Sequence, residues 1–252
     1  MSTTSILAVC VTLALTVVLP VGAMLLLGRR GGKWRCFFAG AAAFILFAMI
    51  LEQLLHSAVL RSPAGAVLQG NIWLYGLYGG LAAGLFEETG RLAAFRLLLK
   101  KETRPVTALA YGLGHGGIEA MLITGMTMVN NLIVAAAVSG GRELAPELES
   151  AAAVLAATPA TLFLWAGFER VVAIALHVAN SVLVFAAVRR QRYGLYLAAI
   201  LTHTAVNFLA VVTNAYCSVA ITELAVLAFT ALVALAAARV YRGLTEEGEH
   251  LC

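Results

Sequence analysis

Several charged side chains lie inside apolar stretches that are long enough to cross a membrane. Glu87, Glu88 and Arg91 fall together within one such stretch. An ionisable group at membrane depth costs a few kcal/mol at least, so three of them side by side need a reason. Other apolar stretches contribute further polar residues: His115 and Glu119, His177 and Asn180, and His203 and Asn207.

These residue types are sufficient for hydrolysis of an amide bond. A carboxylate beside Arg91 can stay ionised, while a second carboxylate in low dielectric can take a proton from water as a general base. A histidine can orient that water or protonate the leaving amine, and a histidine–asparagine pair can donate hydrogen bonds to an oxyanion. The chain lacks the Ser-His-Asp order, the aspartyl motif and the HExxH motif of classical proteases.

Residue counting places the polar groups at one depth. At a rise of about 1.5 Å per residue, Glu87 and the three histidines lie roughly 14–20 Å from the basic ends of their spans. Residues four apart share one helix face, and three pairs have this spacing: Glu87 and Arg91, His115 and Glu119, and His203 and Asn207. We therefore expect four helices to meet around one polar site.

The elements that carry these residues are predicted to be membrane-spanning helices. Of 252 residues, 62% are hydrophobic and 12% are charged, which is outside the range of soluble proteins. About 20 apolar residues make a span. Seven segments qualify: 6–27, 36–55, 72–99, 106–128, 161–188, 195–212 and 219–238. The predicted fold is an all-α polytopic membrane bundle in a plasma membrane of the bacterial inner-membrane type.

The basic residues predict the orientation of the bundle. They concentrate in the segments 29–35, 100–105 and 189–194 and after the last span, whereas the opposite side has only Arg61 and Arg142. By the positive-inside rule the first three segments are cytoplasmic loops and 130–158 is an extracytoplasmic loop. The N-terminus is then outside and the C-terminus inside. The same rule explains the net charge of +4, so we expect no nucleic-acid partner.

The chain is expected to form a single integral membrane domain over residues 1–252, with its motifs within about 72–213. Residues 151–157 are expected to form an interfacial helix or a re-entrant turn. Two further charged pairs, Glu169 with Arg170 and Glu52 with His56, are placed by residue counting near the outer membrane surface. An interfacial ion pair is the simplest interpretation of each.

The motifs resemble those of the YhfC family of intramembrane proteases, which is related to the CPBP group of CAAX-processing and bacteriocin-immunity proteases. The resemblance covers about residues 85–208. It rests on four patterns: Glu87-Glu88-x-x-Arg91, Tyr111-x-x-x-His115, Glu169-Arg170 with His177, and His203-x-x-x-Asn207-Phe208.

The resemblance implies a peptidase in which a glutamate activates water, without a cofactor. Glu87 would be the base and His115 its partner, supported by Glu88 and Arg91, while the oxyanion donors would be His203 and Asn207. In the CPBP group the arginine follows the glutamates after three residues, whereas here it follows after two. This shift rotates Arg91 by about 100° on the helix, which leaves open which of the two glutamates is the base.

Three points remain open: the full set of site residues, the use of a metal ion, and whether the chain is an enzyme. Glu119, His177 and Asn180 are possible additional site residues, and Glu119 could instead orient the His115 ring. A zinc ion could be the catalyst, because three histidines and a carboxylate match zinc ligands in type; the ligands would be Glu87, His115, His177 and His203. The chain could also be a proton-coupled transporter, or an immunity or scaffold protein that binds a peptide. The expected partners of an enzyme are a membrane protein or peptide substrate and the lipid bilayer.

Overall fold

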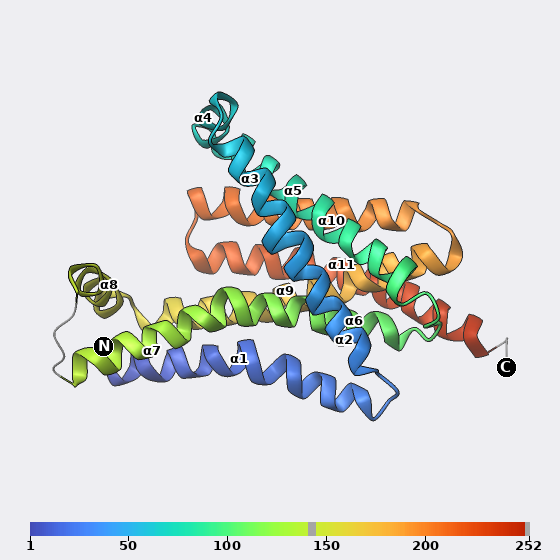
Figure 1. Ribbon diagram of the computed structural model, residues 1–252, viewed down its shortest axis with the longest axis horizontal. Helices are drawn as coiled ribbons and strands as arrows, with labels where there is room; N and C mark the ends of the chain where they lie inside the picture. The colour runs from blue at the N-terminus through green and yellow to red at the C-terminus, as the bar shows by residue number, and fades with distance from the viewer. Residues whose placement is uncertain (141–144, 250–252) are drawn as a thin grey trace.

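The computed structural model describes residues 1–140 and 145–249, and these residues form a bundle of helices (Figure 1). The elements in chain order are α1 (Thr3–Gly28), α2 (Trp34–Phe44), η1 (Ile45–Glu52), α3 (Gln53–Leu60), α4 (Pro63–Gln69), α5 (Ile72–Ala93), η2 (Ala94–Leu98), α6 (Val106–Glu119), η3 (Ala120–Gly125), α7 (Met126–Ser139), α8 (Pro146–Ala157), α9 (Ala160–Arg190), α10 (Gly194–Tyr216) and α11 (Val219–Glu249). The segments η1, η2 and η3 are π-helical and continue the α-helices before them.

Six helical stretches among the described residues are long and apolar enough to cross a membrane. They are α1, α2 to α3, α6 to α7, α9, α10 and the main part of α11. The segment α5 with η2 has the length of a span, but Glu87, Glu88 and Arg91 lower its hydropathy. The all-α polytopic membrane bundle is thus confirmed, whereas the count of seven spans stays a prediction.

Successive long helices run back and forth along the bundle (Figure 1). The helix α1 begins at the left end of the view, and α11 ends toward the right. The predicted orientation relative to the cytoplasm stays a prediction, and Arg142, one of the two basic residues on the expected outer side, lies outside the described residues. The expected outer loop 130–158 is largely helical, because α7 continues to Ser139 and α8 occupies Pro146–Ala157.

The helix α9 is the centre of the bundle. It is buried along most of its length and packs against α1, α6 and α11, while α5 packs chiefly on α10 and α2 on α6. In Figure 1 the continuous helix from α2 to α3 crosses the other helices steeply. This arrangement brings the polar faces of α5, α6, α9 and α10 to the interior.

Glycines permit the close approach of these helices, as expected for small residues in membrane bundles. Gly40 of α2 lies against the backbone of Tyr111 and His115 in α6, and Gly114 of α6 lies against the carbonyl of Phe37. Gly80 of α5 similarly faces the backbone of α10. A side chain at Gly40 or Gly114 would collide with backbone atoms, which cannot move aside as a flexible side chain can.

Replacing Gly114 by alanine is expected to lower the thermal stability of the purified protein in detergent. Its Cβ would meet the Phe37 carbonyl oxygen, and overpacking of this kind costs about 1–3 kcal/mol. The matched control is Gly79→Ala, because a Cβ at Gly79 of α5 has no atom within 4 Å. Equal unfolding temperatures for the two variants would contradict the close packing of α2 on α6.

Candidate functional site

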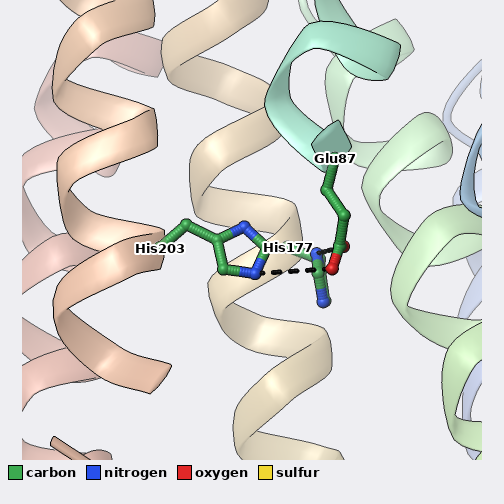
Figure 2. Close-up of side chains that lie close together, drawn as sticks. All are labelled: Glu87, His177 and His203. Carbon is green, nitrogen blue, oxygen red and sulfur yellow. Dashed lines mark ion pairs between the residues drawn. The ribbon is translucent and has the colours of Figure 1, made fainter. Parts of the chain in front are cut away.

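Glu87 projects from α5 toward histidines on three other helices. Figure 2 shows two of these histidines, His177 and His203. Its Oε2 atom is hydrogen-bonded to His115 Nε2 of α6 at 2.8 Å. His177 Nδ1 of α9 lies 3.9 Å from Oε2, and His203 Nε2 of α10 lies 3.7 Å from Oε1. All four side chains are buried. The four helices therefore meet at one level, as the comparison of depths predicted.

Two further carboxylates hold the histidine nitrogens that point away from Glu87. His203 Nδ1 is hydrogen-bonded to Glu88 Oε1 at 2.8 Å, and His177 Nε2 lies 2.5 Å from Glu119 Oε2. A carboxylate on one ring nitrogen fixes the tautomer and leaves the other nitrogen free to donate its lone pair. Both rings thus turn their other nitrogen toward Glu87; that of His203 is free, whereas that of His177 also contacts Arg91 Nη2. Glu119 lies one turn after His115 but contacts His177, so of its two possible roles the one that orients the His115 ring is wrong.

Arg91 neutralises Glu88 and ties α5 to α9. Its Nε atom lies 2.8 Å from Glu88 Oε2, in an ion pair with both side chains fully buried. Its Nη1 atom donates to the His177 carbonyl at 2.6 Å and to the Ser181 hydroxyl. Its Nη2 atom lies 3.1 Å from His177 Nδ1. The shortened motif spacing thus directs Arg91 to Glu88, three residues earlier, and leaves Glu87 to the histidines.

Arg170 belongs to this network and is not confined to an interfacial pair. It contacts Glu169, as expected, but its Nη1 atom also donates to Glu119 Oε1 at 2.7 Å. Only 9% of Arg170 is exposed. The interfacial interpretation is incomplete because residue counting locates the backbone, whereas the long arginine side chain reaches toward the centre. Through Glu119, Arg170 supports the position of His177.

The two asparagines differ in their surroundings. Asn180 is fully buried, donates from Nδ2 to Glu88 Oε1 at 3.3 Å and accepts from the Thr202 hydroxyl at 3.0 Å. Asn207 makes no side-chain hydrogen bond within residues 1–140 and 145–249, and it lines the cavity beside Glu87 and His203. Asn180 therefore holds Glu88 in place, whereas Asn207 has a free amide next to the site.

A cavity of about 100 Å³ adjoins the candidate site. Its polar lining comprises Glu87, His177, His203, Asn207, Glu119, Glu169, Arg170, Glu223 and Thr230. A second cavity of about 460 Å³ also reaches Asn207 and is lined by Glu52 and His56. The expected pair of Glu52 with His56 is present at 3.1 Å, although Glu52 is buried.

The donor set of Glu87, His177 and His203 fits a zinc ion. One ligand atom from each lies within 4.8 Å of the others, and two imidazoles with one glutamate are a known catalytic zinc set. Tetrahedral ligands at about 2.0–2.1 Å from zinc stand about 3.4 Å apart, close to the 3.7 and 3.9 Å between these histidines and Glu87. His115 is outside this group. Binding at His177 Nδ1 would require Arg91 to release one contact while it keeps those to Glu88 and Ser181.

Sequence reasoning missed two functional candidates. Ser181 lies one turn after His177 and binds Arg91, a position that the four-residue spacing could have shown. Glu223 lies in the last apolar stretch, where a lone carboxylate is itself a signal of function. Its position near the start of that stretch gives it the pattern of an interfacial residue, yet only 9% of it is exposed.

The fold and the site define a class of protein, a polytopic membrane protein whose cluster of buried ionisable side chains lies inside a bundle of apolar helices. A family model described as YhfC intramembrane metalloprotease matches residues 15–229. The chain is also 35% identical over 213 residues to the uncharacterized membrane protein YhfC of Bacillus subtilis (strain 168), covering 79% of this chain and 81% of the relative.

The chain belongs to the YhfC intramembrane metalloprotease family. This confirms the family suggested by the motifs and the location in a membrane. The description of the family favours the metal-dependent alternative over a reaction without a cofactor. It is consistent with the grouping of Glu87, His177 and His203.

Proposed function

We propose that this protein hydrolyses a peptide bond of a membrane-associated protein or peptide with a divalent metal ion, most simply zinc, held by Glu87, His177 and His203. The observation that carries the proposal is the pairing of each histidine with a second carboxylate. Glu88 and Glu119 bind one nitrogen of each ring, and the other nitrogen of each ring faces Glu87. Such carboxylate–histidine pairs are typical of metal sites.

A bound zinc ion would supply a water of lowered pKa and polarise the scissile carbonyl. The residues of the chain do the rest. Arg91 and Asn180 hold Glu88, and Arg170 holds Glu119, so both carboxylates are positioned to orient the rings of His203 and His177. His115 shares a hydrogen bond with Glu87 and can exchange a proton with it. The free amide of Asn207 can donate a hydrogen bond to the developing oxyanion.

A second candidate is the same hydrolysis without a metal. In that reaction Glu87 would be the base that takes a proton from water, and His115 would hold the water with it. The observation in its favour is the buried 2.8 Å hydrogen bond between these residues, together with the contact of Arg91 with His177 Nδ1. His203 and Asn207 would then both serve the oxyanion.

Comparison of membrane-protein fragments in cells tests whether the chain is a protease at all. Cells that make the wild-type protein or the Glu87→Gln variant at equal levels are compared for new peptide termini. We expect a set of fragments that appears with the wild type and disappears with Glu87→Gln. His56→Gln is the matched control, because His56 pairs with Glu52 outside the donor set. Identical fragments in all three cells would favour a transporter or a binding protein instead.

A further inference from the structure

Glu223 is a buried carboxylate that the reaction does not use. It lies on α11, lines the cavity beside Glu87, His177 and His203, and is 9% exposed. Its Oε2 atom has no hydrogen-bond partner within the described part of the chain. The cavity therefore contains an acceptor that the protein itself leaves unused.

The carboxylates near Glu223 outnumber the cations that could neutralise them. Glu119 and Glu169 share the guanidinium of Arg170. Among residues 1–140 and 145–249, the charged neighbours of Glu223 are the same Glu169 and Arg170, so the one cation near it is already bound by two other carboxylates. A buried carboxylate without its own cation is unfavourable, and an incoming cation removes that cost.

We propose that Glu223 selects a substrate with a lysine or arginine side chain near the cleaved bond, by accepting hydrogen bonds from its ammonium or guanidinium group. The proposal rests on the proteolytic function proposed above. Charge-assisted hydrogen bonds are the strong ones in sites that exclude water. The cavity volume of about 100 Å³ is that of about three water molecules, which suits one extended side chain.

The position of Glu223 agrees with this role. It lies about 6 Å from the start of α11, and Glu169, whose side chain is 41% exposed, lies on the same cavity. His177 lies about two turns beyond Glu169 along α9, deeper in the bundle. Thr230 also lines the cavity, and its buried hydroxyl has no partner among the residues that the structure describes. If the substrate enters past Glu169, its cationic side chain would meet Glu223, and the backbone of the substrate would face the histidines.

Binding of matched peptides tests the proposal without any cleavage. The full chain in detergent with a chelator is titrated with a capped apolar heptapeptide that has lysine at its centre, and with the same peptide carrying norleucine. We expect the lysine peptide to bind about tenfold more tightly to the wild type, a difference of about 1.4 kcal/mol. The Glu223→Gln variant should bind both peptides equally, and Glu223→Asp should keep part of the preference.

The control is Glu246→Gln, the same change at an exposed position of α11 outside the cavity. It should keep the full preference for lysine. A lysine preference that survives Glu223→Gln, or equal binding of both peptides by the wild type, would overturn the proposal. If Glu223→Gln fails to fold, Glu223→Ala takes its place: it should lose the preference for lysine, and added acetate should restore it, whereas an unrestored preference would overturn the proposal.

This outcome is independent of the test for proteolysis. A lysine preference without any fragments in cells would retain Glu223 as a cation-binding residue and reject the protease. Fragments in cells without a lysine preference would retain the protease and reject the role of Glu223.

Discussion

Replacing Glu87 by glutamine is expected to abolish peptide cleavage while the bundle stays folded. Glutamine has nearly the same shape and can keep the contact with His115, but it loses the negative charge that either a metal ion or a general base requires. Loss of a general base alone costs about 10²–10⁴-fold, and loss of a metal ligand adds to this. The rate of cleavage of a substrate found by fragment comparison provides the measurement, with thermal unfolding as the check on folding.

Glu88→Gln is the informative comparison for this prediction. Glu88 is bound by Arg91, His203 and Asn180, so its replacement should lower stability as well as activity, because it leaves Arg91 buried without its partner. Full activity of Glu87→Gln would refute the assignment of Glu87. An inactive Glu88→Gln beside an active Glu87→Gln would exchange the roles of the two glutamates.

Removal of the metal is expected to stop the reaction completely. Protein purified without chelator should contain about one zinc ion per chain, and treatment with 1,10-phenanthroline should remove both zinc and activity until zinc is added back. His177→Ala and His203→Ala should each lose the zinc, because each removes one of three protein donors. Elemental analysis by mass spectrometry measures the zinc content of each variant directly and needs no substrate.

The matched control for metal content is His56→Ala, which removes a histidine bound to Glu52 and Tyr78 outside the donor set. It should retain the zinc. Full activity in protein shown to be free of metal would support the second candidate, in which Glu87 and His115 activate water alone. His115→Ala separates the two routes further, because His115 is outside the donor set and should keep the zinc while it slows the proton transfer.

The helices and the common level of the polar residues could be predicted from the sequence. A charge inside an apolar helix is so costly that Glu87, His115, His177 and His203 had to point inward, and the rise per residue then fixed their depths. The partners of each residue could not be predicted, because they depend on the rotation of one helix against another. Glu119 binds His177 of α9 and not its own neighbour His115, and Arg91 binds Glu88 and not Glu87.

Whether the protein uses a metal ion could not be decided from the sequence, for a related reason. Zinc motifs such as HExxH place two ligands on one helix, whereas Glu87, His177 and His203 come from α5, α9 and α10. No local spacing marks such a site, and only the folded bundle brings its donors together. The description of the family and the carboxylate behind each histidine are what support the proposed metal site.

The charges of α5 also affect how the protein is made. This helix is less apolar than the other long helices, and its compensating contacts lie far ahead in the chain. Arg91 binds His177, 86 residues later, and Glu88 binds His203, 115 residues later. When α5 leaves the ribosome, neither partner has been synthesised. The charges of α5 therefore lack these partners until α9 and α10 have been made, and the polar centre of the bundle is complete only when α10 has joined it.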